Sequence, residues 1–197
     1  MKETSKYSGT KDLISSLEHV YELKSLPRSG WIQSGIPHAG VESIASHSYG
    51  MSLLILYLRE QLQAEGVNVE RALNMALIHD IAESIVGDLT PHDNVSQTDK
   101  YVAEFDALKQ IIRGVREGAY FQELWEDFEN VESPEAQVVK RIDKLDMLIQ
   151  AYFYEKKYKM RLDSFWENME ELFIGSESEQ IYEYIRSNRF EFKGNET

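Results

Sequence analysis

Apolar residues recur every three to four positions along most of this chain, which is the spacing of one face of an α-helix. Only four prolines and eleven glycines interrupt the pattern. We therefore predict an all-α fold without sheets. The expected helices cover approximately residues 10–25, 43–64, 69–85, 97–117, 119–130, 134–158, 163–173 and 176–190.

One long segment, residues 26–42, lacks helical spacing and is predicted to be a loop. It contains Pro27 and Pro37 together with three glycines. Long loops inside a compact domain are usually functional or disordered. Arg28 and Trp31 are unusual in disordered segments, so we expect a functional loop.

Three ionisable residues, His79, Asp80 and Glu83, continue an apolar stripe on the expected helix 69–85. Asp80 follows Leu73 by seven residues and His79 follows Ala72 by seven, so both return to the buried face. A buried carboxylate without a partner is very costly, which predicts a cation or a metal ion nearby. The alternative is a helix end in solvent, with His79 and Glu83 as an i,i+4 pair.

Two other helices carry the same anomaly. His47 lies within the apolar face of the helix 43–64, either as a ligand or as a core histidine bonded to a backbone carbonyl. On the helix 134–158, Asp146 lies inside the apolar face and Asp143 at its edge. Periodicity alone favours Asp146 as the buried group, and a solvated flank is the alternative for both.

Two imidazoles and two carboxylates form a mixed nitrogen and oxygen set, which suits Co, Mn, Ni, Fe, Mg or Zn. We predict one divalent metal ion held between helices. Four protein ligands on a six-coordinate ion leave positions for water and a substrate oxygen. Such an ion acidifies bound water and neutralises charge on a phosphoryl group.

The composition of the chain limits the classes of molecule that it is expected to bind. With 21 Lys and Arg against 34 Asp and Glu, the net charge is −13, which disfavours binding to a nucleic-acid polymer. The chain has no cysteine, so disulfides and thiolate metal sites are excluded. The longest apolar run, residues 51–58, is too short for a membrane span, and the first residues do not look like a signal peptide. We expect a cytoplasmic protein without a membrane partner.

Four ordered motifs carry a family resemblance: Leu-Pro-Arg-Ser-Gly-Trp (26–31), Glu-Ser-Ile-Ala-Ser-His-Ser-Tyr (42–49), Ala-Leu-Ile-His-Asp-Ile-Ala-Glu-Ser-Ile-Val-Gly-Asp-Leu-Thr-Pro (76–91) and Lys-Arg-Ile-Asp-Lys-Leu-Asp-Met (140–147). The set resembles the HD-domain metal-dependent phosphohydrolases, and among them the 5′-deoxynucleotidases of the HD domain-containing protein 2 and YfbR type. The resemblance covers about residues 10–155. It implies a single HD domain over residues 1–197, with C-terminal helices near 160–190 that carry no recognised motif.

The resemblance also implies roles for particular residues. Its metal ligands fall on His47, His79, Asp80 and Asp143, so the family pattern favours Asp143 over Asp146. Its catalytic carboxylates fall on Glu83 and Asp88, and its substrate-binding Arg and Trp on Arg28 and Trp31. Two positions depart from the family, which often has an acidic residue at Ser46 and an arginine at Gly50. The family also implies a homodimer.

The implied reaction is hydrolysis of deoxynucleoside 5′-monophosphates to deoxynucleoside and phosphate. Hydrolysis of another small nucleotide or phosphoester is an alternative, as is a catalytically silent metal or nucleotide sensor. A binding module needs neither Glu83 nor Asp88, so their presence favours an enzyme. The spare histidines His19, His38 and His92 are expected at the surface, which favours one metal over two.

Overall fold

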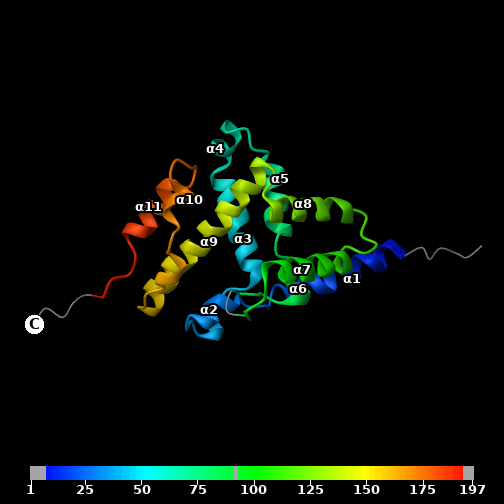
Figure 1. The fold of residues 1–197 in the computed structure, drawn as a ribbon, viewed down its shortest axis with the longest axis horizontal. Coiled ribbons are helices and arrows are strands. Elements are labelled where there is room, and N and C mark those ends of the chain that lie inside the picture. The colour runs from blue at the N-terminus through cyan, green and yellow to red at the C-terminus, as the bar shows by residue number, and fades with distance from the viewer. Residues whose placement is uncertain (1–7, 91–92, 193–197) are drawn as a thin grey trace, which may run out of the picture.

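The computed structural model describes residues 8–90 and 93–192, and its regular elements there are all helices (Figure 1). The predicted all-α fold is confirmed. An isolated bridge between Pro27 and Ser43 is the one β-type pairing within those residues. The elements are α1 (Ser8–Glu22), α2 (Ser29–Gln33), η1 (His38–Gly40), α3 (Ile44–Tyr57), α4 (Arg59–Ala64), α5 (Val69–Ile78), α6 (Glu83–Val86), α7 (Gln97–Ile111), α8 (Gly118–Asn130), α9 (Pro134–Tyr158), η3 (Asp163–Phe165), α10 (Glu170–Phe173) and α11 (Glu179–Ser187).

Capping residues define where the long helices begin. Ser43 accepts a hydrogen bond from the Ser46 amide at the start of α3, as its sequence position predicts. Ser133 caps α9 in the same way, and Pro134 occupies the first turn, where its missing N–H costs nothing. The entry points of α3 and α9 are therefore fixed by local sequence.

Four expected helices were wrong in their extent. The expected helix 69–85 ends at Ile78 and resumes as α6 at Glu83, and the helix 43–64 is divided at Leu58 into α3 and α4. The expected helix 97–117 ends at Ile111. The segment 163–173 forms η3 and α10, which residues 166–169 separate. The loop 26–42 also contains the short helices α2 and η1. The first break lies at the candidate site, where the His79 ring bonds the Ala76 carbonyl.

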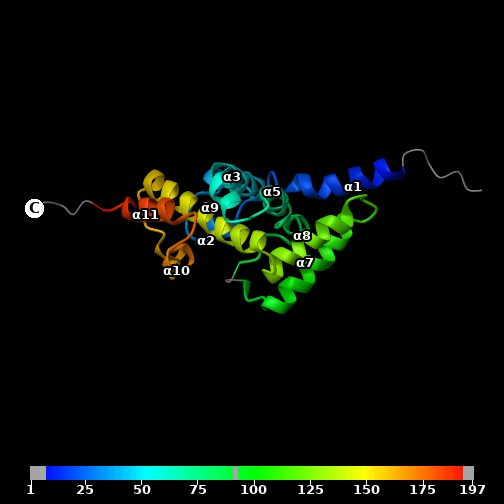
Figure 2. The same cartoon turned by 90° about the horizontal axis from the view of Figure 1, so that it is seen from above.

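Helices α3, α5 and α9 pack against one another and form the centre of the molecule. Figure 2 shows α9 running obliquely from the C-terminal helices towards α7 and α8. The main apolar cluster contains fully buried side chains from each central helix, such as Met51, Met75 and Ile142. This packing brings the polar residues of three helices towards one interior region.

Flanking helices close the two ends of this core. Helices α1, α6 and α7 contact one another and enclose a second apolar cluster around Leu108 and Ile111. At the other end, α11 packs on α9, and Arg189 forms an ion pair with the fully buried Glu155. None of the described helices combines the length and the apolar character that a membrane crossing requires.

Candidate metal centre and active site

His79 and Asp80 lie where α5 ends. The His79 ring donates from Nδ1 to the Ala76 carbonyl at 2.9 Å, and the backbone bonds that follow span three residues rather than four, as from the Ile81 amide to the Ile78 carbonyl. This tightened turn places His79 Nε2 2.9 Å from Asp80 Oδ2. His79 is 4% exposed and Glu83 is 5% exposed, so the alternative of a helix end in solvent is wrong.

His47 on α3 is fully buried and is held by two aspartates of α9. Its Nδ1 lies 2.8 Å from Asp146 Oδ2, and its Nε2 lies 3.1 Å from Asp143 Oδ1. Both aspartates are buried, so neither belongs to a solvated flank. His47 is therefore bonded to carboxylates, and not to the backbone carbonyl that an ordinary core histidine would use.

The two aspartates lie on opposite sides of the His47 ring, and this distinguishes them. His79 uses its Nδ1 for the Ala76 carbonyl, which leaves Nε2 directed at Asp80. Asp143 lines the same cavity as His79 and Asp80. Asp146 does not line that cavity, and its carboxylate lies close to His47 and Glu42. The geometry favours Asp143 as a ligand and Asp146 as the group that orients the ring.

The charges of the site depend strongly on one another. Burial disfavours the charged form of Asp80, but His79 and Arg28 outweigh burial and lower its pKa. Burial acts in the same way on Asp143, and there Lys144 and His47 lower the pKa. Burial and Arg28 lower the pKa of His47, yet its two aspartate partners raise it overall to about 9. Asp80 and Asp143 are therefore anionic at neutral pH.

The donor set fits a divalent cation. Ligand atoms of His47, His79 and Asp80 lie within 4.8 Å of one another. His79 Nε2 is buried and has no hydrogen-bond partner among the described residues, although a carboxylate oxygen lies beside it. Two imidazole nitrogens beside anionic oxygens form the mixed set that Mn, Fe, Co, Ni and Zn accept.

The two candidate catalytic carboxylates differ in environment. Glu83 begins α6, and its Oε2 is buried without a hydrogen-bond partner in the described part of the chain. Burial raises the pKa of Glu83 well above its usual range, and the charges of Asp80 and Asp88 raise it further. Asp88 follows Gly87, whose φ of +81° suits glycine, and it accepts a hydrogen bond from the Ser29 amide.

Arg28 and Trp31 reach the site from the loop between α1 and α3. The Arg28 amide donates to the Glu42 carbonyl at 3.1 Å, and the guanidinium lies 3.2 Å from Asp80 Oδ2. Trp31 donates from Nε1 to Glu42 at 2.8 Å and is only 2% exposed. Burial disfavours the Arg28 cation, but Asp80 and nearby carboxylates raise its pKa overall, so it stays charged.

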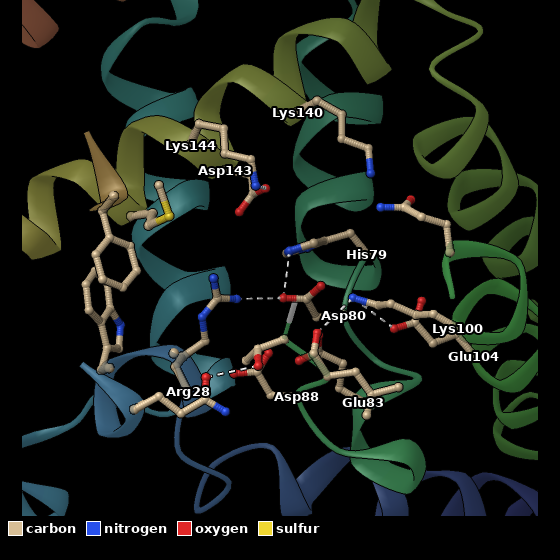
Figure 3. Close-up of a pocket in the computed structure, with 18 of the residues that line it drawn as sticks. Arg28, His79, Asp80, Glu83, Asp88, Lys100, Glu104, Lys140, Asp143 and Lys144 are labelled. Carbon is tan, nitrogen blue, oxygen red and sulfur yellow. Dashed lines mark hydrogen bonds and ion pairs between the residues drawn. The ribbon is translucent and has the colours of Figure 1, made fainter. Parts of the chain in front are cut away.

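A cavity of about 660 Å³ joins these groups (Figure 3). The predicted site residues that line it are Arg28, Trp31, His79, Asp80, Glu83, Asp88 and Asp143. His47 lies behind Asp143 and does not line the cavity. Figure 3 shows Arg28 and Lys100 on opposite sides of Asp80. The cavity is large enough for a nucleotide-sized ligand.

Sequence reasoning missed several residues around this cavity. Lys100 lies 3.5 Å from Glu104, and Lys144 lies 3.0 Å from Asp143, but an isolated lysine carries no sequence signal of this kind. Ser164 and Phe165 also line the cavity, although they lie beyond the recognised motifs. Of the spare histidines, His38 is exposed and His19 is half-buried, while His92 lies outside the described residues.

Comparison with known sequences identifies relatives over most of the chain. The HD domain family profile matches residues 20–183. The 5′-deoxynucleotidase HDDC2 of Danio rerio is 41% identical over 149 residues, which are 74% of this chain and 70% of the relative. The human protein of the same name is 33% identical over 187 residues, which are 92% of this chain and 88% of the relative.

Comparison with solved structures gives the same picture. A conserved hypothetical protein from Pyrococcus furiosus superimposes with a TM-score of 0.73 at 36% identity, covering 88% of this chain and 99% of that protein. The similarity therefore includes the helices that carry the candidate ligands as well as those that flank them.

Proposed function

This chain belongs to the HD-domain family, and from that premise we infer that it is a metal-dependent 5′-deoxynucleotidase. It hydrolyses deoxynucleoside 5′-monophosphates to deoxynucleoside and phosphate, the activity for which its relatives from zebrafish and human are named. The observation that carries the assignment is the meeting of His79, Asp80, Glu83 and Arg28 in one cavity. Imidazole, carboxylate and guanidinium groups are the parts that metal-assisted phosphoester hydrolysis requires.

We propose that His47, His79, Asp80 and Asp143 hold one divalent ion. The short distances among the ligand atoms of His47, His79 and Asp80 support three members of this set. Asp143 is included because its Oδ1 lies 3.1 Å from His47 Nε2 and because it lines the same cavity as His79 and Asp80. Asp146 bonds the remote nitrogen of His47 and fixes the orientation of its ring. When bound, the ion supplies Lewis-acid chemistry, since it acidifies water and neutralises phosphoryl charge.

Glu83 and Asp88 handle protons in this proposal. Because burial raises the pKa of Glu83, its carboxyl can retain a proton and donate it to the leaving 5′-oxygen. Asp88 orients the attacking water, and its bond to the Ser29 amide holds its side chain in place. A binding protein without turnover would need neither a raised carboxyl pKa nor a second cavity carboxylate.

Arg28 binds the substrate phosphate. A cation is needed because the chain carries a net charge of −13 and six carboxylates line the cavity. The planar guanidinium can contact two phosphate oxygens at once. Trp31 lies beside it and limits the space around the sugar, which is the basis for a preference for deoxyribose over ribose.

A homodimer in the cytoplasm, with the whole chain acting as one domain, completes the proposal. Helix α3 is apolar on both sides: Met51 and Ile55 are fully buried, while Tyr49, Leu56 and Tyr57 are exposed at helical spacing. An exposed apolar stripe of this kind is a typical interface. A second copy of the chain is the partner that the family resemblance implies.

Phosphate release from a panel of nucleoside monophosphates tests the assignment. We expect release to require an added divalent ion after chelation and dialysis, and to be faster with deoxyribonucleotides than with ribonucleotides. The Glu83→Gln variant should bind the same metal without releasing phosphate, which excludes a contaminating phosphatase. Release from non-nucleotide phosphoesters alone would contradict the proposed substrate, and no release with any metal would contradict the enzyme.

A further inference from the structure

Trp31 offers little free surface to a ligand, although it lines the cavity. One face of its indole stacks on Phe165 with ring centroids 4.3 Å apart and an angle of 25° between the planes. The edge of Tyr154 lies against it at 5.2 Å, and the whole residue is 2% exposed. Phe165 is half-buried, so it retains accessible surface where Trp31 does not.

Charged and neutral residues line different parts of the cavity. Lys100, Glu104, Glu129 and Lys140 come from α7, α8 and α9 and are paired with one another across short distances. Another group of lining residues is uncharged, and we call it the neutral wall: Gln33, Ser34, Met147, Ser164 and Phe165. Lys144, one turn from Met147 on α9, also lines the cavity, but its ammonium is paired with Asp143 at 3.0 Å. A nucleoside is uncharged and partly apolar, so it is better accommodated at the neutral wall than among ion pairs.

Other aromatic side chains at the cavity are less suitable for stacking. Phe128 is 4% exposed, and the Lys140 ammonium lies 3.6 Å from its ring centroid. Tyr101 stacks on Phe105, and burial together with Glu126 and Glu129 raises its pKa, which reflects its acidic surroundings. Phe165 is the aromatic ring of the cavity that combines accessible surface with uncharged neighbours.

The segment that carries Phe165 is held firmly. Asp163, at the start of η3, forms ion pairs with Arg161 and Arg189, each at 2.8 Å. The Leu162 amide donates to the fully buried Glu155 at 2.8 Å. Both anchors lie in the C-terminal quarter of the chain, so Arg189, which follows α11, and the end of α9 hold the segment of Phe165 in place. A preorganised ring loses little entropy when a ligand stacks on it.

We propose that Phe165 is the surface on which the nucleobase stacks, with Met147 and Ser164 beside it, so that the C-terminal segment forms the nucleoside subsite. This rests on the proposed function and deepens it. Arg28 holds the phosphate, and the base extends along the neutral wall towards η3. A flat ring stacks on any base, so this subsite recognises a nucleoside without strict selection among bases.

Two substrates that differ only in the base test the proposal. For deoxyadenosine 5′-monophosphate, Phe165→Ala should lower kcat/KM about 10-fold, mainly through KM, because stacking on an aromatic ring contributes that much to binding. For 2-deoxyribose 5-phosphate, which has no base, the same variant should retain the wild-type kcat/KM. Phe165→Trp restores a flat ring and should recover most of the loss. Calorimetric binding of deoxyadenosine, without phosphate, should weaken in parallel.

Phe192→Ala is the matched control, since Phe192 is 69% exposed and does not line the cavity. It should leave both substrates unaffected. An equal loss for both substrates in Phe165→Ala would mean that Phe165 only supports Trp31, and would overturn the subsite. A wild-type enzyme that hydrolyses both substrates equally well would also overturn it. If wild type hydrolyses neither, the proposed function itself fails, which is a distinguishable result.

Discussion

At the scale of single residues, His47 is held from both sides of its ring. Asp143 meets Nε2 and Asp146 meets Nδ1, although the two aspartates are only three positions apart on α9. The sequence predicts a buried histidine and a nearby buried aspartate, but periodicity alone favours Asp146 as the ligand. Which nitrogen each aspartate meets depends on how α3 and α9 approach each other, and no local pattern encodes this.

Substitution of the two aspartates should separate their roles. We expect Asp143→Asn to abolish stoichiometric metal binding, because a ligand charge is lost. Asp146→Asn should bind the metal 10- to 100-fold more weakly, as is typical when the group behind a histidine ligand is changed. Metal titration of the two purified variants measures both. The reverse order of severity would make Asp146 the ligand and show that the family-based choice of Asp143 is wrong.

Glu83 and Asp88 should affect turnover without affecting metal binding. Each of Glu83→Gln and Asp88→Asn removes a proton-handling group, which typically costs 10²- to 10⁴-fold in rate. The measurement is kcat beside the metal content of the same preparation. If a variant is purified without metal, the substituted residue is a metal ligand or supports one. If a variant is fully active, the substituted residue has no part in the mechanism.

At the scale of elements, the close approach of α3 and α9 depends on a missing side chain. A Cβ atom at Gly50 would lie 2.2 Å from Asp146 Oδ1. The Asp146 side chain therefore occupies the space that any residue larger than glycine would need. The sequence marks Gly50 as a departure from the family, but the reason is visible only in the packing. Likewise, the break between α5 and α6 depends on the hydrogen bond from the His79 ring to the Ala76 carbonyl, which periodicity cannot predict.

Gly50→Ala should therefore change metal affinity much more than it changes thermal stability. Alanine is the better helix former by about 1 kcal/mol. This gain offsets part of the about 1–3 kcal/mol that overpacking against the buried Asp146 costs, so thermal stability should fall only slightly. Asp146 must move, which loosens His47, and metal affinity should fall about 10-fold. Thermal unfolding and metal titration of the same sample decide this. Gly66→Ala has open space for the new Cβ and serves as a packing control, although its φ of +83° adds strain. Unchanged metal affinity in Gly50→Ala would show that Asp146 does not orient His47.

Asp127 joins three helices, and its contribution should depend on pH. It accepts hydrogen bonds from the Ser133 amide and hydroxyl and lies 2.8 Å from Arg71. Burial raises its pKa, but Ser133 and Arg71 outweigh burial and lower it overall. A carboxyl whose pKa is lower in the folded state stabilises the protein at pH values above its pKa in the unfolded chain. This stabilisation is lost as the pH falls through the pKa of the folded state.

Asp127→Asn should thus lower the free energy of unfolding by about 1–2 kcal/mol at pH 7. The difference from wild type should shrink from about pH 4 downward, since the carboxyl of the unfolded chain is protonated there first and the native carboxylate only at lower pH. Urea unfolding at several pH values measures this. Asp106→Asn is the control, because Asp106 is exposed and forms its ion pair with the surface residue Lys109. A difference that is constant with pH would contradict the role of the charge.

At the scale of the whole molecule, the fold class follows from periodicity, and polar residues placed against it mark the candidate metal site. The roles proposed for Asp88, Arg28 and Trp31 come from the family resemblance instead. The contribution of the C-terminal segment follows from neither, because Phe165 reaches the cavity only through the anchors at Glu155 and Arg189. A lone phenylalanine in a short helix looks like any core residue. Interfaces pose the same problem, since the sequence of α3 does not reveal which apolar side faces outward.

The exposed stripe of α3 predicts how the molecule assembles. Tyr57 is 79% exposed and Tyr49 is 65% exposed, on the side of α3 opposite the fully buried Met51 and Ile55. Tyr57→Asp places a charge in the proposed interface, which should convert a dimer into a monomer while helicity and metal content stay unchanged. Light scattering across a concentration series measures the mass. Tyr184→Asp, at a position that is 63% exposed on α11, should remain dimeric. A wild-type protein that is monomeric at all concentrations, or a Tyr57→Asp variant that stays dimeric, would show that this stripe is not the interface.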